Sequence, residues 1–385
     1  MTLCYCAACL ACRRLRVNRQ KLAILVSFSG QGGVERMIAN LSQALTTFPV
    51  DLDILLIKAR GPHVGALPET ARIIPLKARH TATSIFEVAR YLRRERPDAV
   101  LAIKHRAILA ALQARALARV DVPISGRLGT TVSAALANKS ESRRRRWYRA
   151  MRRYYPKLHR LIAVSQGVAD DVIDITGMSN PQVTVVRNPT ITPTLFELAE
   201  APAPHPWLVD AGPPVVIGVG RLTEQKDFTT LLGAFSHVVS RQEARLIILG
   251  EGDQRDALLK QAADLGVSDK IALPGFQSNP WSWMRRAHLF VLSSRWEGSP
   301  NTLTEALALG VPVVSTDCPS GPRELLDSGR IAPLVPMGDT EALAEAMLGA
   351  LRDPGSASLR TAAVSAYHHD ASARAYLHTL GLGGV

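Results

Sequence analysis

The chain has 385 residues, of which 47% are hydrophobic and only 5% aromatic. This length is enough for two domains of about 100–200 residues each, with cores built mainly from aliphatic side chains. No apolar run reaches the ~20 residues that a membrane-spanning helix needs. The first basic residues follow the first apolar stretch instead of preceding it, which is not the pattern of a signal peptide. We therefore expect a cytoplasmic protein.

The formal net charge of +13 is spread unevenly along the chain. Residues 1–190 contain 31 Lys or Arg and 12 Asp or Glu, a balance of 31 − 12 = +19. Residues 191–385 contain 15 and 21, a balance of 15 − 21 = −6. A strongly basic half is typical of proteins with an anionic partner, which can be nucleic acid, an anionic membrane or a phosphate-rich substrate.

The first 20 residues precede the first predicted strand and carry four of the five cysteines. These are Cys4, Cys6, Cys9 and Cys12. Their spacing resembles a metal cluster, but no second pair of cysteines lies further along the chain. A metal site and an acylated tail stay open as alternatives, and we favour a disordered extension over residues 1–20 that a wrong start site could add. We expect Cys318 to be structural and no disulfide to form.

From residue 21 onward, strands and helices are predicted to alternate. Short apolar runs typical of buried parallel strands recur at 22–27, 52–57, 99–103, 161–164 and 183–186. Segments with helical periodicity lie between them at 34–47, 84–95 and 106–119. This alternation predicts a first α/β domain, doubly wound around a parallel sheet, over residues 21–190.

The most basic part of this domain is residues 143–160. It contains nine Lys or Arg and no acidic residue, interleaved with aromatic side chains. On a helix, Trp147, Met151 and either Tyr154 or Tyr155 would share one face. One interpretation is an interfacial helix on an anionic membrane, and the other is a solvated helix whose aromatic stripe packs on its own domain. We favour membrane contact and expect no nucleic-acid binding.

A proline-rich segment separates this domain from a second one. Residues 188–214 contain seven prolines and little periodicity, so we place a linker at 191–212. A second domain over residues 213–370 repeats the alternation. Its strands are predicted near 215–220, 245–249, 271–273, 289–293, 312–315 and 331–335. A last helix is predicted within residues 371–385.

Two glutamates, Glu297 and Glu305, flank a turn of Gly, Ser, Pro and Asn in the second domain. The apolar run before the turn predicts a buried strand, and Asn301 is a candidate N-cap for a helix that ends at Gly310. Open α/β sheets build ligand crevices from a strand, a glycine turn and a helix, and the helix start can hold phosphate. Carboxylates accept hydrogen bonds from sugar hydroxyls, so the pair indicates a ribose or hexose site. Alternatively, Glu305 is an ordinary glutamate favoured by the helix dipole.

Two cations, Arg221 and Lys226, directly follow the strand predicted at 215–220. A fork-shaped guanidinium and a point-like ammonium together suit a diphosphate. A solvated basic turn is the alternative. The position at the carboxyl end of a strand favours the diphosphate.

In their order and spacing, these motifs resemble the retaining glycosyltransferases of family 4. The glycine loop at 32–35, the segment 187–189 and the segment 318–325 also match, the last resembling a subgroup that builds surface polysaccharides and lipid-linked glycans. The resemblance covers nearly the whole chain from about residue 21. It implies a GT-B fold, with two doubly wound Rossmann-like domains facing across a cleft. The N-terminal domain would bind the acceptor, the C-terminal domain would bind the nucleotide-sugar donor, and the last helix would cross back to the first domain.

The resemblance also implies roles for single residues. Arg221 and Lys226 would neutralise the diphosphate, Glu305 would hold the ribose hydroxyls, and Glu297 would contact the donor sugar. His105 falls near the position where several relatives carry a histidine facing that sugar, with a surface histidine as the alternative. The donor site would be completed by Gly32, Gly33, Gly220, Gly298, Ser299, Pro300, Asn301 and Thr302.

The implied activity is retaining transfer of a hexose or N-acetylhexosamine from a nucleotide diphosphate sugar, with a UDP-sugar favoured. The acceptor would be a glycan or a polyprenyl-diphosphate-linked sugar at the inner face of the cell membrane, where the enzyme would be peripheral. No metal or cofactor is expected, because two cations can replace a metal and the Asp51–Asp53 pair lies at the start of a strand. Alternatives are a nucleotide-sugar 2-epimerase or a phosphorylase on the same fold, and a basic nucleic-acid-binding protein.

Overall fold

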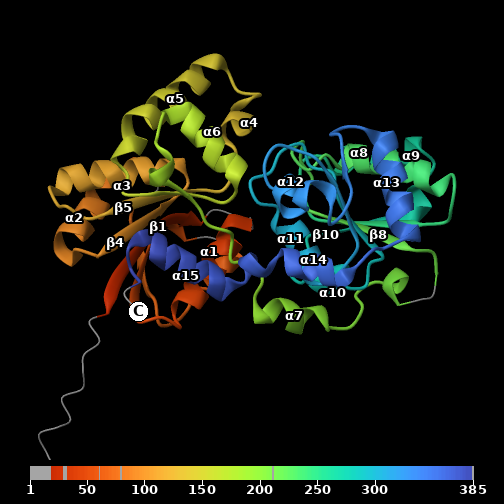
Figure 1. Cartoon of the computed structure of the whole chain (residues 1–385), viewed down its shortest axis with the longest axis horizontal. Helices are drawn as coiled ribbons and strands as arrows, with labels where there is room; N and C mark the ends of the chain where they lie inside the picture. Colours follow the sequence, from red (N-terminus) through yellow and green to blue (C-terminus); the bar gives the residue numbers. More distant parts are fainter. Residues whose placement is uncertain (1–18, 29–32, 60, 79, 210–211, 384–385) are drawn as a thin grey trace, which may run out of the picture.

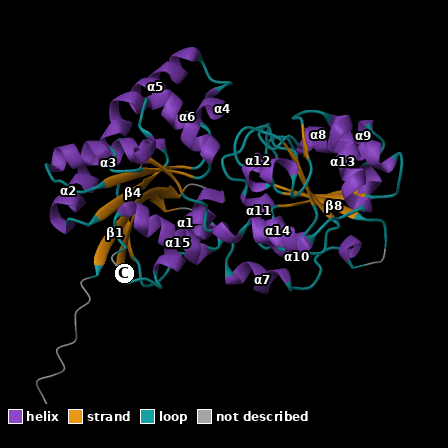
Figure 2. Ribbon diagram, in the orientation of Figure 1, coloured by secondary structure: helices purple, strands orange, loops and turns teal. Residues whose placement is uncertain are grey.

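The computed structural model describes residues 19–28, 33–59, 61–78, 80–209 and 212–383. These residues form two α/β domains, each built around one parallel sheet with helices on both faces (Figure 1, Figure 2). The α/β class predicted from the sequence is thus confirmed. The four N-terminal cysteines and Gly32 lie outside the described residues, so the predictions made for them stay predictions.

The first sheet has seven strands in the order β3-β2-β1-β4-β5-β6-β7. They are β1 Gln20–Phe28, β2 Val50–Ala59, β3 Arg72–Pro75, β4 Ala99–Ile103, β5 Ile124–Leu128, β6 Leu161–Ala163 and β7 Val183–Val185. Alternate residues of β1 enter different cores, with Leu22 and Ile24 on one face and Ala23 and Leu25 on the other. A strand buried on both faces must be apolar throughout, which explains its continuous apolar run.

Helices cover both faces of this sheet. They are α1 Gly33–Leu45, α2 Ile85–Glu95, α3 His105–Ala118, α4 Val132–Leu136, α5 Glu141–Tyr154 and α6 Gln166–Thr176. Helices α2, α3, α5 and α6 contribute to the core on one face, and α1 contributes to the core on the other.

The second sheet has six strands in the order β10-β9-β8-β11-β12-β13. They are β8 Val215–Val219, β9 Arg245–Leu249, β10 Ile271–Gly275, β11 Leu289–Leu292, β12 Val313–Thr316 and β13 Leu334–Val335. Its helices are α8 Phe228–Val239, α9 Arg255–Asp264, α10 Trp281–Met284, α11 Asn301–Ala308, α12 Pro322–Leu325, α13 Thr340–Arg352 and α14 Ala357–Ala363. The strand order reverses between β8 and β11, and ligands of open α/β sheets bind at such a switch point.

Two further helices connect the domains. Helix α7, Pro193–Ala199, lies within the proline-rich segment and buries Leu195 in the core of the second domain. Helix α15, His369–Leu380, returns to the first domain and lies beside α1 (Figure 1). Its Tyr376 is fully buried there, and the Tyr376 hydroxyl accepts a hydrogen bond of 3.0 Å from Arg127. The last helix is therefore part of the first domain's core.

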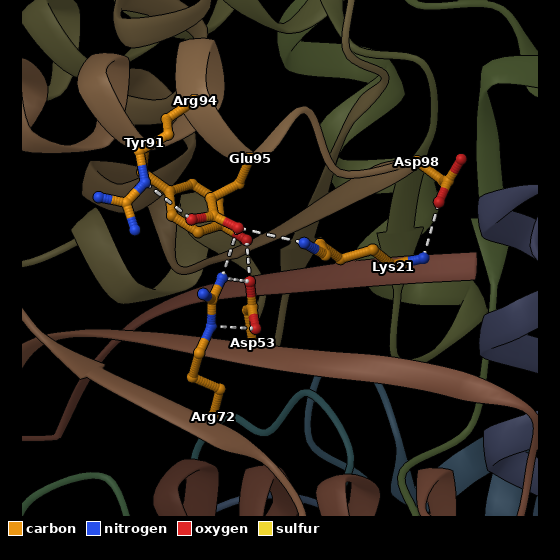
Figure 3. Close-up of polar contacts among 7 residues, drawn as sticks. All are labelled: Lys21, Asp53, Arg72, Tyr91, Arg94, Glu95 and Asp98. Atoms are coloured by element: carbon orange, nitrogen blue, oxygen red, sulfur yellow. Dashed lines mark hydrogen bonds and ion pairs between the residues drawn. The ribbon is translucent and has the colours of Figure 1, made fainter. Parts of the chain in front are cut away.

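Asp53, the second residue of the Asp51–Asp53 pair, has a structural role in the first sheet (Figure 3). Asp53 is buried, and it accepts hydrogen bonds from Arg72 Nε at 2.8 Å and from the Tyr91 hydroxyl at 2.6 Å. Arg72 also donates to Glu95 at 2.9 Å, and this contact holds the pKa of Glu95 at about 2. Asp53 thus ties β2 and β3 to α2.

Among the described helices, none is both long and apolar enough to cross a lipid bilayer.

Candidate active site

The switch point of the second sheet brings three predicted site residues into one region. Arg221 and Lys226 follow β8, and Glu297 follows the adjacent strand β11. Lys226 Nζ donates to Glu297 Oε1 at 2.6 Å, and Ser294 Oγ donates to the same oxygen at 2.8 Å. Glu297 is only 6% exposed, so this pair of charges is shielded from water. Interactions between charges are stronger in such a site than in bulk water.

The two cations differ in their surroundings. A Cβ atom on Gly220 would lie 3.0 Å from the side chain of Lys226, so the absence of a side chain at residue 220 lets the lysine cross the end of β8. Arg221 is exposed and forms no ion pair with a carboxylate in the part of the chain that the structure describes. Its charge is therefore available to an anion.

Helix α11 begins at Asn301, and Pro300 occupies the N-cap position. The expectation that Asn301 caps the helix with its side chain is thus wrong. The Asn301 carboxamide instead accepts a hydrogen bond of 2.9 Å from Asn188, which follows the last strand of the first domain. It also donates to the backbone carbonyl of Gly33 at 3.5 Å. The predicted glycine loop and the predicted donor turn therefore meet across the domain interface.

Gly298 lies where the two domains approach each other closely. A Cβ atom at this position would lie 2.2 Å from the carbonyl oxygen of Gly129, a residue of the first domain. Thr131 of the first domain also donates to the carbonyl oxygen of Glu297 at 3.0 Å. The turn that carries Glu297 is thus covered by backbone from the opposite domain, which limits the access of water.

A second interdomain contact joins two of the sequence motifs. Arg187 donates to Glu324 at 2.6 Å, and the backbone N–H of Gly167 at the start of α6 donates to the same carboxylate at 3.1 Å. Segments 187–189 and 318–325 therefore hold the domains together. Cys318 of the second segment is buried, and burial raises the pKa of its thiol to about 12. The thiol stays protonated, as a structural role requires.

Glu305 is fully buried in α11 and faces the first domain. Its Oε1 forms an ion pair with Arg36 of α1, while its Oε2 has no hydrogen-bond partner within the described ranges of the chain. Burial raises the pKa of Glu305, and the positive charge of Arg36 opposes this shift. Thr302 Oγ1 in the same helix is also buried without a partner. Unpartnered buried oxygens mark positions where a bound ligand can supply the missing hydrogen bonds.

Arg36 is the functional candidate that the sequence analysis did not name. Its partner Glu305 lies 269 positions further along the chain, so no local pattern connects them. The sequence feature that could have indicated Arg36 is its position directly after the glycine loop at 32–35, in the first turn of α1.

His105 begins α3 and is 7% exposed, so the alternative of a surface histidine is wrong. Its ring stacks on Trp147 of α5 with 4.2 Å between centroids, and Nδ1 lies 2.9 Å from the Tyr155 hydroxyl. Burial lowers the pKa of His105 to about 4. The imidazole is therefore neutral near pH 7, and its contact with the donor sugar stays a prediction.

His105 should make the protein sensitive to acid. The unfolded chain binds a proton as the pH falls below 6.5, whereas the folded chain binds it only near pH 4. The free energy of unfolding should therefore fall by up to about 3 kcal/mol across this window because of this residue. His105→Phe keeps a ring against Trp147 and removes the titration. Urea unfolding at pH 7 and pH 4.5 should show a smaller loss in the variant, and equal losses would contradict the assignment.

The basic helix α5 buries its aromatic stripe in its own domain. Met151 and Tyr155 are fully buried, and Trp147 and Tyr154 pack against the same core. The stripe thus packs on its own domain with Trp147 and Tyr154 partly exposed, and contact with a membrane stays a prediction. The exposed side of the helix and the following turn is formed by Arg143, Arg145, Arg146, Arg149, Arg152, Arg153 and Lys157.

Two family models match the two domains separately. "Glycosyltransferase Family 4" matches residues 31–192, and "Glycosyl transferases group 1" matches residues 213–353. A lipopolysaccharide core biosynthesis glycosyltransferase of Rhizobium meliloti is 28% identical over 87% of this chain and 89% of its own length. An N-acetylgalactosaminyltransferase of Campylobacter jejuni that acts on a diphospho-undecaprenol-linked sugar is 29% identical over 52% of each chain. Several curated relatives are matched over about half of their length or less.

Solved structures give the same fold. Anabaena HepE in complex with UDP superposes with a TM-score of 0.76 at 20% identity, covering 94% of this chain and 100% of that one. The fold is GT-B, and the protein is a glycosyltransferase of glycan biosynthesis. Within that class, the chain belongs to glycosyltransferase family 4.

Proposed function

We propose that the enzyme transfers a hexose or N-acetylhexosamine from a nucleotide diphosphate sugar, with retention of the anomeric configuration. The observation that carries this proposal is that the Lys226–Glu297 pair lies near the buried carboxylate of Glu305 in α11, of which only Oε1 is paired. One cationic and two acidic groups in a covered site match a donor that combines a diphosphate with hydroxyl groups. A UDP-sugar is favoured, because a structural neighbour of the same fold holds UDP.

The leaving group of this reaction is a nucleoside diphosphate, whose developing negative charge is the main feature to stabilise. Lys226 and Arg221 would stabilise it, and with two cations in place no metal ion is required. Glu297 would bind hydroxyls of the transferred sugar, and Glu305 would bind the ribose. The departing phosphate oxygen would take the proton of the acceptor hydroxyl, so no side chain is assigned as a general base. Closure of the domains would keep water from intercepting the sugar.

The acceptor would be a glycan or a polyprenyl-diphosphate-linked sugar at the inner surface of the cell membrane. This proposal rests on the names of the relatives from Rhizobium and Campylobacter and on the exposed arginines of α5. Because the aromatic side chains of α5 are packed inward, membrane contact would be electrostatic and would weaken with salt.

Replacing Arg145, Arg149 and Arg153 of α5 with glutamine should therefore reduce sedimentation with phosphatidylglycerol vesicles. Each basic side chain near an anionic surface contributes about 1 kcal/mol, so the three together should lower the partition coefficient by about 100-fold. Neutral phosphatidylcholine vesicles serve as the control surface. Equal sedimentation of the variant and the wild-type protein would exclude α5 as the membrane contact.

The donor assignment is tested by thermal unfolding in the presence of UDP-, GDP-, ADP- and TDP-sugars. A true donor at 100 times its Kd should stabilise the folded state by about 2.7 kcal/mol. The anomeric configuration of the product is then read by NMR with the acceptor present. Isomerisation of the donor alone would indicate an epimerase, and an inverted product or no stabilising nucleotide sugar would overturn the proposal.

A further inference from the structure

Arg36 reaches across the domain interface to Glu305. It lies in the first turn of α1, and its guanidinium forms an ion pair with Glu305 Oε1 of α11. The Arg36 side chain is 23% exposed and that of Glu305 is 1% exposed, so the pair is largely removed from water. The guanidinium carbon also lies 5.4 Å from the centroid of the Trp281 ring, a cation–π contact that fixes its position.

The ion pair occupies only one oxygen of the Glu305 carboxylate. Oε2 is buried and accepts no hydrogen bond from the residues that the structure describes. The indole N–H of Trp281 faces the carboxylate and helps to lower the pKa of Glu305, although it does not reach hydrogen-bond geometry with a described residue. An arginine that bound the carboxylate in a bidentate manner would use both oxygens and block the site. The single contact instead leaves Oε2 as a buried acceptor that a ligand hydroxyl can satisfy.

We propose that Arg36 is a positioning residue that holds the Glu305 carboxylate from the opposite domain, so that Oε1 stays with Arg36 while Oε2 binds a ribose hydroxyl of the donor. This inference rests on the proposed assignment of Glu305 to the ribose. It adds that the ribose site is complete only when the two domains are closed, because Arg36 comes from the first domain and Glu305 from the second.

Electrostatics explains why the carboxylate needs this partner. A fully buried carboxylate without a cation is costly and tends to take up a proton. Burial raises the pKa of Glu305, and the positive charge of Arg36 lowers it more than Lys226 or Trp281, which also face the carboxylate. Without Arg36, the carboxylate loses both its charge compensation and its fixed direction. Recognition of the ribose hydroxyls should then fail, while contacts to the diphosphate and the base remain.

The test compares UDP with 2′,3′-dideoxy-UDP by calorimetry in the wild-type protein and in Arg36→Met. The wild-type protein should bind UDP at least about tenfold more tightly than the dideoxy compound, because the analogue leaves Oε2 unpaired. In Arg36→Met this preference should fall below about twofold. A general folding defect would weaken both compounds equally and leave their ratio unchanged. If GDP or ADP is the nucleotide that binds, its dideoxy analogue is used in the same comparison.

Two further variants complete the design. Arg241→Met removes an exposed ion pair with Glu345 in the second domain and should keep the full preference for UDP. Arg36→Lys should keep part of the preference, and it replaces the methionine variant if that protein does not fold. Tighter binding of UDP to Arg36→Met would show that Arg36 competes with the nucleotide, which overturns the inference.

The remaining outcomes separate this inference from the proposed function. A wild-type preference for UDP that persists unchanged in Arg36→Met overturns only the role of Arg36. If the wild-type protein binds both compounds equally, the ribose assignment of Glu305 is wrong, and the inference falls with it. If no nucleoside diphosphate binds at all, the proposed function itself is wrong.

Discussion

Lys226→Met should lower kcat by at least about 100-fold, in the range found when one preorganised charge-stabilising group is removed from an active site. The ammonium of Lys226 lies 2.6 Å from Glu297 and is the most buried cation at the end of β8. Under the proposed function, its removal takes away the charge that would face the leaving diphosphate. It also leaves the buried carboxylate of Glu297 without its cation, which would disturb the proposed sugar site. Steady-state kinetics with the donor identified by thermal unfolding measures this loss.

Lys260→Met is the matched control for this substitution. Lys260 also forms an ion pair of 2.6 Å, with Asp264 in α9, but its side chain is 75% exposed. An exposed pair of this kind contributes at most about 1 kcal/mol to stability and faces no ligand, so kcat should be unchanged. Thermal unfolding of both variants separates a loss of catalysis from a loss of fold. A kcat of Lys226→Met within twofold of the wild-type value would exclude Lys226 from the diphosphate site.

The strands predicted from the sequence are mainly apolar runs, in which a single polar residue such as Asp53 of β2 did not hide the pattern. Two strands of the first sheet, β3 and β5, were missed for different reasons. Strand β3 lies at the edge of the sheet, and three of its four residues are exposed, so it lacks an apolar run. Strand β5 is fully buried but contains Ser125, Gly126 and Arg127. Arg127 is tolerated there only because Tyr376 and Asn188 satisfy its guanidinium, and both come from distant parts of the chain.

The site residues, like the strands, could be predicted only where a local sequence pattern marks them. Arg221, Lys226, Glu297 and Glu305 could be named because a glycine turn between a strand and a helix is a local pattern. The contribution of the first domain could not be located in this way, since Arg36 meets Glu305 only through the packing of two domains. The aromatic residues of α5 show that a local pattern can also be ambiguous. A helical stripe of Trp and Tyr has the same spacing whether it faces lipid or the core of its own domain, and only the structure shows that it packs on the core.

Gly298→Ala should abolish most of the activity without destabilising either domain. The backbone at Gly298 does not have a positive φ, so alanine introduces no local strain. Its methyl group would instead lie 2.2 Å from the Gly129 carbonyl oxygen, about 1 Å closer than van der Waals contact permits. Because the opposing atoms belong to the backbone, the domains must separate to admit it. A misplacement of about 1 Å can cost 100-fold in rate, so kcat/KM should fall by at least about that factor.

Because this clash lies at the domain interface, its effects on nucleotide binding and on the size of the molecule can be predicted. Separation of the domains would also withdraw Arg36 from Glu305, so Gly298→Ala should lose the preference for UDP over its dideoxy analogue. Small-angle scattering should show a larger radius of gyration than that of the wild-type protein. Gly349→Ala in α13 is the matched control, because a Cβ atom there meets nothing within 4 Å and alanine favours the helix. Wild-type activity in Gly298→Ala would mean that catalysis does not require the closed arrangement, since no flexible side chain at this contact could yield in place of the domains.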